Sequence, residues 1–296
     1  MILGFWLDQP VWLIFALLGA LLAGVVGMIR LVATLPLTRG RWLRLTGLVA
    51  PYFSSISVLL ALFTGFVAND AWERQRQAVR TVQTEGDTAV AIYDLSLATV
   101  SDMAHIRAHL AAYLRAVTGD EWHQMQTAQA SPKAAEALAL LLQAVVVPSV
   151  GADAGAASQT ALLDLVLRLR AARSDRLSLA QSNSDETKWL ALVILASLTL
   201  LALALVHIES PRAQVTAMTV FSIAMTSTLG LIALHERPFD GPLPVSAKPL
   251  SAALARVVAR PPPPAAAPSP APVPDARPES PPAAPAAPLD SGRPPG

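Results

Sequence analysis

Four long apolar stretches dominate the pattern of this chain. They run from Val11 to Ile29, Leu48 to Ala68, Trp189 to Val206 and Ala213 to Leu234. A bilayer core of about 30 Å requires about 20 mostly apolar residues in helical form, so each stretch predicts a membrane span. A short Arg-rich loop joins the first two, and the turn at residues 207–212 joins the last two. The sequence therefore predicts an all-α membrane protein with four transmembrane helices in two pairs.

The polar region between the two pairs, residues 69–188, has a helical period. Its apolar residues recur at three- and four-residue steps: Val79, Val82, Ala89, Ile92, Met103, Ile106, Leu110, Tyr113 and Val117. Thr118 and Glu121 predict a capping box that opens a helix, with Trp122 in the core. Ser131 before Pro132 predicts another helix start, and residues 148–155 predict a loop. From Thr160 a further amphipathic helix is expected to carry four arginines: Arg168, Arg170, Arg173 and Arg176.

These patterns divide the chain into four parts. Residues 1–68 hold the first transmembrane pair (11–29 and 48–68), and residues 69–188 form a helical extramembrane region. Residues 189–258 hold the second pair (189–206 and 213–234) and the turn after it. Residues 259–296 are rich in Pro and Ala, with 15 of the chain's 25 prolines from Pro261 onward. Such a composition cannot build a core, so we expect a disordered tail.

Composition supports a membrane protein and argues against several other classes. Of all residues 53% are apolar, and the formal net charge is only +1, so no global field favours nucleic acid. Residues 1–10 contain no Lys or Arg, so we do not expect a cleavable signal peptide. The chain has no cysteine, phosphate-binding loop, nucleophile elbow or paired-carboxylate motif, so we expect no enzyme activity and no cofactor. His105 and His109 are four residues apart, but two ligands do not make a zinc site, so we expect no metal.

The second apolar stretch carries two adjacent stripes and a polar exit. One stripe is bulky: Val58, Leu62 and Phe66. Residues four apart share a helix face, and these side chains either contact lipid and neighbouring helices or form a narrow apolar ring that excludes water. The other stripe is small and predicts close helix packing: Ser57, Ala61, Gly65 and Ala68. At the exit we expect a collar, either of interfacial anchors or of vestibule residues: Asn69, Trp72 and Arg74.

Hydroxyl side chains recur along the fourth apolar stretch, at Thr216, Thr219, Ser222 and Thr226. Two interpretations remain open for them. A hydroxyl stripe can line water, but such hydroxyls more often bond to their own backbone or to a neighbouring helix. We favour the packing interpretation.

Two short motifs resemble a known family. GFVANDAWER at residues 65–74 resembles the end of the second membrane helix in bacterial bestrophins, with matches at Gly65, Phe66, Asn69, Trp72 and Arg74. HERPFDGPLPVS at residues 235–246 is similar to that family's Glu-x-Pro-Phe-Gly turn. The matching positions are Glu236, Pro238, Phe239 and Gly241, with Asp240 inserted before the glycine. With the order of spans, the resemblance to the bestrophin-like family covers roughly residues 5–258.

The resemblance implies a pentameric anion channel of the cell (inner) membrane. It implies that Val58, Leu62 and Phe66 form a pore neck, and that the termini and residues 69–188 are cytoplasmic. Small anions and other copies of the chain are then the expected partners, together with the lipid bilayer. The chain lacks the acidic cluster with which bestrophins bind calcium after the Pro-Phe turn, since only Asp240 is nearby and Pro242, Leu243 and Pro244 follow. One carboxylate cannot supply the six to eight oxygens that calcium prefers, so we expect no calcium gating.

A second function class remains open from the residues themselves. Long helices that continue from the second and third spans also suit a sensory or scaffolding protein with a helical ligand- or partner-binding module. Charge counts do not decide the orientation of the chain. Five basic residues lie on one side, namely Arg30, Arg39, Arg41, Arg44 and Arg212. Eight lie on the other, namely Arg74, Arg76, Arg80, Arg173, Arg176, Lys188, Arg237 and Lys248.

Overall fold

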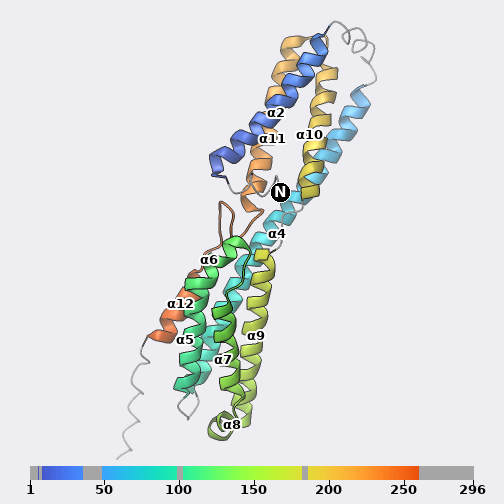
Figure 1. Ribbon diagram of the computed structural model, residues 1–296. Helices are drawn as coiled ribbons and strands as arrows, with labels where there is room; N and C mark the ends of the chain where they lie inside the picture. Colours follow the sequence, from blue (N-terminus) through green and yellow to red (C-terminus); the bar gives the residue numbers. More distant parts are fainter. Residues whose placement is uncertain (1–5, 7–8, 36–48, 99–102, 182–185, 260–296) are drawn as a thin grey trace, which may run out of the picture. The chain divides into compact units, whose positions relative to one another are not determined.

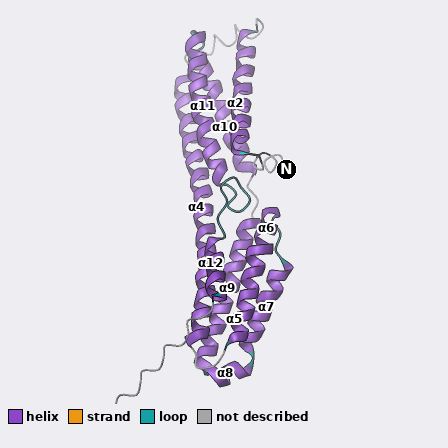
Figure 2. Ribbon diagram, turned by 90° about the vertical axis from the view of Figure 1, so that its left-hand side faces the viewer, coloured by secondary structure: helices purple, strands orange, loops and turns teal. Residues whose placement is uncertain are grey.

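The computed structural model describes Trp6 and residues 9–35, 49–98, 103–181 and 186–259. Within these ranges every regular element is a helix, as Figures 1 and 2 show, which confirms the all-α prediction. Two predicted features lie outside the described residues. They are the Arg-rich loop with Arg39, Arg41 and Arg44, and the Pro-rich tail from Pro261.

Four helices of the described ranges are long and apolar enough to cross a membrane. They are α2 (Val11–Thr34), α4 (Val49–Ala98), α10 (Glu186–Val206) and α11 (Pro211–His235). Each contains one predicted span, apart from the predicted first residue Leu48, which lies outside the described residues. The four spans and their order are therefore confirmed. In space the contacts cross between the sequence pairs, because α2 packs most extensively on α11, and α4 packs on α10.

A first apolar core holds these four helices together. It buries side chains from every span, including Ile14, Leu22, Leu60, Val67, Leu192, Leu200, Met218 and Leu229. α2 and α11 approach each other closely, since a Cβ on Gly230 would overlap the ring of Phe15. Small residues allow such approaches between membrane helices. Here the close contact lies at Gly230 rather than on the small stripe of α4.

A second apolar core lies in the extramembrane helices and shares α4 with the first. At 50 residues α4 is about 75 Å long, and its later part buries Ala78, Val82, Ala89 and Ile92 in this second core. The other contributors are α5 (Ala104–Ala116), a π-helical turn (Val117–Glu121), α6 (Trp122–Gln124), a 3₁₀ turn (Met125–Thr127), α7 (Pro132–Val146), α8 (Pro148–Ala154), α9 (Ala156–Gln181) and α12 (Lys248–Val258). One continuous helix thus joins the membrane to the bundle.

The predicted capping box at Thr118 and Glu121 is wrong. Both residues lie in the π-helical turn that continues α5 into α6, so the chain is already helical there and no side-chain cap forms. The Thr118 hydroxyl donates to the Leu114 carbonyl 2.8 Å away, within the same run of helix. Glu121 is fully buried, and its carboxylate binds Arg173 and Arg176 and accepts from the Ser131 N–H at 3.2 Å, rather than from the N–H of Thr118. The residues of a capping box are present, but Glu121 is used for ion pairs with Arg173 and Arg176. Trp122 is partly buried and packs against the second core, as predicted.

Other local predictions have mixed outcomes. Ser131 caps α7 as predicted, because its hydroxyl accepts from the Ala134 N–H at 3.4 Å and Pro132 is the first helical residue. The predicted loop at residues 148–155 is wrong, since Pro148 opens the short helix α8. That helix meets α7 at a bend of 55°, and together the two helices are long and apolar enough to cross a membrane. We assign it to the bundle because its buried residues belong to the second core. Val79 is exposed, so the prediction from its spacing that it lies on the apolar face of the helix is wrong.

Candidate functional site

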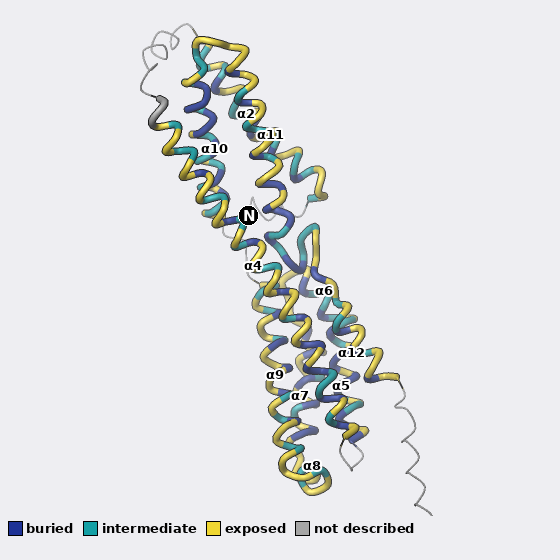
Figure 3. Tube along the Cα trace, turned by 180° about the vertical axis from the view of Figure 1, so that it is seen from behind, coloured by how far each residue is buried: buried dark blue, intermediate teal, exposed yellow. Residues whose placement is uncertain are grey.

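The bulky stripe on α4 lies on the exposed side of the helix. The exposed fractions of Val58, Leu62 and Phe66 are 65%, 55% and 64%. The opposite side of α4 is buried in the first core through Leu60, Val67 and Ala71, which are at most 4% exposed. Figure 3 shows this division between buried and exposed positions along α4. The three neck candidates thus share a face that no other helix of the described chain covers.

The small stripe is only partly engaged within the chain. Ser57 and Ala68 are half-buried, whereas Ala61 and Gly65 are exposed. Beyond its own turns of α4, no atom of the described residues lies within 4 Å of a Cβ built on Gly65. Close helix packing at this stripe therefore remains a prediction. At Ala61 and Gly65, which are exposed, the predicted packing partner would have to be another chain.

The exposed face of α4 becomes polar beyond the neck candidates. Asn69, Glu73, Arg76 and Arg80 follow at helical spacing, and all four are exposed. Glu73 pairs with Arg76 at 2.8 Å and approaches Arg80 at 3.8 Å. Two arginines and one glutamate leave this stretch with one net positive charge. An apolar stripe thus runs directly into a basic one on the same helix face.

The exit collar connects the two motifs that carry the family resemblance. The Arg74 guanidinium donates to Asp70 at 2.7 Å and to Glu236 of the Pro-Phe turn at 3.2 Å. The rings of Trp72 and His235 meet edge to face with centroids 6.2 Å apart. Asn69 is exposed and takes no part in these contacts. The structure therefore brings Trp72 and Arg74 to the turn and leaves Asn69 on the exposed stripe.

Asp70 extends this cluster to a third membrane helix. The Lys188 ammonium lies 2.5 Å from the Asp70 carboxylate and comes from the first turn of α10. Asp70 itself belongs to α4, and Glu236 caps the end of α11. Two acids and two bases thus tie α4, α10 and α11 together where they leave the membrane.

The family-like turn after α11 has a fixed internal geometry. The Gly241 N–H donates to the Arg237 carbonyl at 3.0 Å, and a Cβ on Gly241 would overlap that oxygen. Arg237 forms a close ion pair with Asp240, the residue inserted in the motif. Phe239 is buried and meets Trp122 edge to face at 6.0 Å. The Pro238 carbonyl accepts from the Val245 N–H at 2.7 Å. Glycine is needed at position 241 because any side chain there would collide with the Arg237 carbonyl oxygen.

A buried charge network in the extramembrane bundle was not predicted. Arg176 is fully buried, and its guanidinium lies 2.6 Å from Glu85 and 2.7 Å from Glu121, both also fully buried. The Tyr113 hydroxyl donates to Glu85 at 2.6 Å, and Arg173 reaches Glu121 at 2.5 Å. Glu85 and Arg176 occupy apolar-face positions at helical spacing from Val82 and Ala172, which is the sequence signal for their burial.

Burial and charge perturb two groups of this network. Burial raises the pKa of the Tyr113 hydroxyl well above its ordinary value, and the negative charge of Glu85 adds to the rise. For Arg176, burial alone would lower the pKa, but the carboxylates of Glu85 and Glu121 hold it above its ordinary value. The network therefore holds a charged arginine and a neutral tyrosine inside the bundle.

The described residues offer no grouping of three or more His, Asp or Glu side chains that could bind a metal ion. His105 and His109 both lie on α5, as their spacing required. In the fourth span, the Thr216 hydroxyl donates to the Arg212 carbonyl at 3.0 Å, as the packing interpretation expects, whereas the buried Ser222 hydroxyl has no hydrogen-bond partner among the described residues. The candidate site therefore consists of apolar and basic side chains on α4.

Comparisons with known proteins give one consistent family. The model of the bestrophin-like domain matches residues 16–250. A mutant of a bacterial bestrophin homologue from Klebsiella pneumoniae superposes with a TM-score of 0.64 at 14% identity, over 82% of this chain and 99% of that one. A second structure of that homologue gives 0.61 at 13% identity, over 80% and 96%. No curated protein sequence matches this chain. At these identities the structures show a shared fold, while the match over most of the chain shows that it belongs to the bestrophin-like family.

Proposed function

We propose that several copies of this chain assemble into a membrane channel for small anions, lined by α4. The observation that carries this proposal is the exposed face of α4. Val58, Leu62 and Phe66 leave it apolar inside the membrane, and Arg76 and Arg80 make it basic beyond the membrane. The structural likeness to a bacterial bestrophin homologue supports the same arrangement at the level of the fold.

The conduction path is expected to lie between chains rather than within one. The four spans of a single chain pack around a core filled by side chains such as Ile14, Leu192 and Met218. The exposed face of α4 points away from that core. A ring of copies places this face around a common axis, and the family resemblance favours five copies. Ala61 and Gly65, beside the neck face, then allow close contact between neighbouring chains.

Neck and basic stripe have separate roles in this proposal. Rings of Val58, Leu62 and Phe66 form a narrow apolar constriction that gates by excluding water. The stripe of Glu73, Arg76 and Arg80 carries one net positive charge per chain, so a ring of copies attracts anions to the end of the neck.

We also propose that the channel works without calcium. After Pro238 and Phe239 the candidate ligand is Asp240, and its carboxylate binds Arg237 in a close ion pair. A guanidinium in that position repels a divalent cation. Chloride flux is therefore expected to be the same in the presence of calcium and of a chelator.

The extramembrane bundle and both termini are assigned to the cytoplasm of the cell (inner) membrane. Reporter fusions after Gly151, in α8, and after Leu250, in α12, test this assignment. Both fusions are expected to report the cytoplasmic side. A periplasmic signal from either would contradict it.

Chloride efflux from liposomes with purified full-length protein tests the channel proposal. Replacing Val58, Leu62 and Phe66 together by Ala widens the neck and is expected to raise flux several-fold. A matched control replaces three similarly exposed apolar residues of other spans by Ala: Ile194, Val220 and Ile223. The control is expected to leave flux unchanged. Absence of flux from both the wild type and the neck variant would contradict the proposal.

The alternative is a membrane sensory or scaffolding protein. It is favoured by the continuity of α4, since one 50-residue helix can transmit a movement from the membrane to the bundle. This alternative predicts a dimer with the bundle outside the cytoplasm. The mass of the purified protein in detergent, measured by light scattering, separates a dimer from a pentamer.

A further inference from the structure

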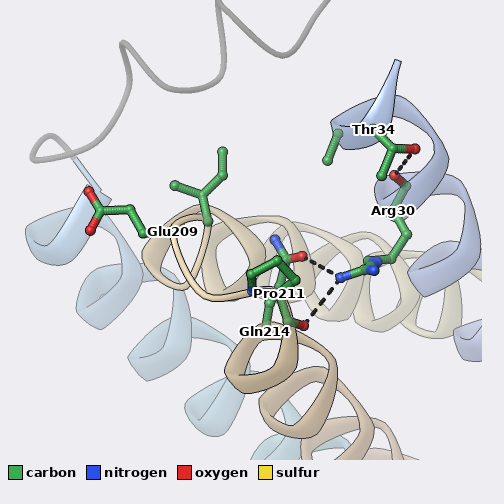
Figure 4. Close-up of a pocket in the computed structure, with 7 residues that line it drawn as sticks. Arg30, Thr34, Glu209, Pro211 and Gln214 are labelled. Atoms are coloured by element: carbon green, nitrogen blue, oxygen red, sulfur yellow. Dashed lines mark hydrogen bonds between the residues drawn. The ribbon is translucent and has the colours of Figure 1, made fainter. Parts of the chain in front are cut away.

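A polar cavity lies at the end of the membrane helices far from the exit collar. Its volume is about 280 Å³, and it opens between the last turns of α2 and the α10–α11 turn. Its walls come from Arg30, Ala33 and Thr34 on one side and from Ile208, Glu209, Pro211 and Gln214 on the other. Figure 4 shows these side chains. Since α2 and α10 end here and α11 begins here, the cavity lies at the ends of three of the four candidate spans.

Arg30 is held in one orientation inside this cavity. Its Nη1 donates to the Gln214 side-chain oxygen at 3.0 Å and to the Pro211 carbonyl at 3.3 Å, as the dashed lines in Figure 4 show. Gln214 is itself buried, and its amide nitrogen donates to the Ala204 carbonyl at 2.7 Å. A chain of hydrogen bonds from α10 through α11 therefore fixes the guanidinium of α2.

The charge of Arg30 is not neutralised by any described residue. Its partners are a carbonyl and a side-chain amide, and both are neutral. Glu209 lines the same cavity, but its side chain points away from the guanidinium in Figure 4. Nη1 makes both contacts, so the Nε and Nη2 hydrogens remain available as a planar fork. Such a fork matches two oxygens of a phosphate group.

Thr34 completes the polar wall without competing for Arg30. Its hydroxyl bonds back to the Arg30 and Leu31 carbonyls of its own helix, both at 3.0 Å. Ala33, Ile208 and Pro211 make the remaining wall largely apolar. A fixed guanidinium beside apolar surface, at the end of the spans, suits a phosphate group that carries an apolar substituent.

We propose that this cavity is a binding site for a phosphate group, held by the Nε–Nη2 edge of Arg30. Gln214 positions the guanidinium, and the ligand supplies the missing negative charge. Two sources offer this chemistry, namely the headgroup of an anionic phospholipid and free phosphate. This site is independent of the proposed pore, because it contains no residue of α4.

Native mass spectrometry of the purified full-length protein tests the proposal with three probes. They are phosphatidylglycerol, diacylglycerol as a lipid without phosphate, and inorganic phosphate. We expect Arg30→Gln to weaken phosphatidylglycerol binding about tenfold and to leave diacylglycerol binding unchanged. Arg212→Gln is the matched control, because it removes the same charge from an exposed position on the first turn of α11. It is expected to change phosphatidylglycerol binding less than about twofold.

A second variant keeps the test decisive if Arg30→Gln fails to fold. Arg30→Lys keeps the charge but loses the fork, and it is expected to weaken phosphatidylglycerol binding several-fold. If inorganic phosphate binds without lipid and depends on Arg30, the ligand is a soluble phosphate. If only phosphatidylglycerol depends on Arg30, the ligand is a lipid headgroup. Equal effects of Arg30→Gln and Arg212→Gln on every probe would overturn the proposal.

Discussion

The buried pair of Glu85 and Arg176 leads to a sharp stability prediction. Glu85→Gln removes a carboxylate that lies 2.6 Å from Arg176, at a point where neither side chain is exposed. Of the described residues, Glu121 is then the one buried carboxylate that contacts Arg176 and Arg173. The loss of one partner leaves a buried charge that is only partly compensated.

The magnitude follows from this loss of charge balance. Breaking a buried ion pair by removing one partner costs about 3–5 kcal/mol. The Tyr113 hydroxyl also loses its charged acceptor at 2.6 Å, and the cost of that loss is included in this range of about 3–5 kcal/mol. A surface pair in the same bundle provides the contrast, since Asp94 and Arg256 are 48% and 57% exposed. Asp94→Asn is therefore expected to cost about 0–1 kcal/mol.

The assay is thermal unfolding of the full-length protein in detergent, followed by tryptophan fluorescence. Trp122 is a local reporter, because the Arg176 guanidinium carbon lies 5.6 Å from its ring centroid. For a region of this size about 1 kcal/mol shifts Tm by roughly 4 °C, so Glu85→Gln is expected to lower Tm by about 12–20 °C. The double change Glu85→Leu with Arg176→Met is expected to recover at least half of that shift, because it removes both charges. A Tm loss for Glu85→Gln no larger than that of Asp94→Asn would refute the reasoning.

Three further predictions concern single positions. Because burial raises the pKa of Tyr113, the folded state keeps a proton that the unfolded chain releases above its ordinary value of 10.0. The stability from this group is complete below pH 10 and falls as the pH rises above it; Tyr113→Phe should flatten that alkaline loss in a Tm series. Gly241→Ala should cost about 1–3 kcal/mol, since its Cβ overlaps the Arg237 carbonyl, whereas Gly119→Ala, with open space around it, should be neutral or stabilising in the same assay. Arg74→Gln should weaken the link between α4 and the turn at Glu236, measured as faster amide exchange in residues 236–241, whereas Arg76→Gln should not.

The membrane part of the fold was predictable because span length and hydropathy are direct consequences of bilayer thickness. The ends of α2, α10 and α11 lie within a few residues of the predicted ones. The packing partners were not predictable, because a short loop between two spans does not require them to pack on each other. In this chain α2 contacts α11 through Gly230 and Phe15, which are far apart in the sequence.

Polar residues inside helices account for most of what the sequence did not reveal. Arg176 was predicted only as one of four arginines on an amphipathic helix, but it is fully buried against Glu85 and Glu121. Glu121 fitted a capping box, and only the tertiary partners on α9 assign it another role. Local patterns describe hydrogen bonds along one helix, whereas ion pairs between distant helices depend on the finished packing.

The candidate site was predicted as a set of stripes, and the structure adds their environment. The neck residues share one exposed face, and Arg74 connects the two family motifs through Glu236. Spacing predicts the shared face but not its exposure, and it does not predict the contact of Arg74 on α4 with Glu236 after α11. The Arg30–Gln214 contact was missed for the same reason.

The central claim is that the exposed face of α4 lines a water-filled anion path. The chain contains no cysteine, so a single introduced thiol is a unique target. Chloride flux through Phe66→Cys, measured in liposomes before and after a charged methanethiosulfonate reagent, tests the claim most directly. We predict that the reagent blocks most of the flux in Phe66→Cys and none in Ile223→Cys, whose side chain is equally exposed on α11. Unchanged flux in Phe66→Cys, or equal block in both variants, would contradict a pore lined by α4.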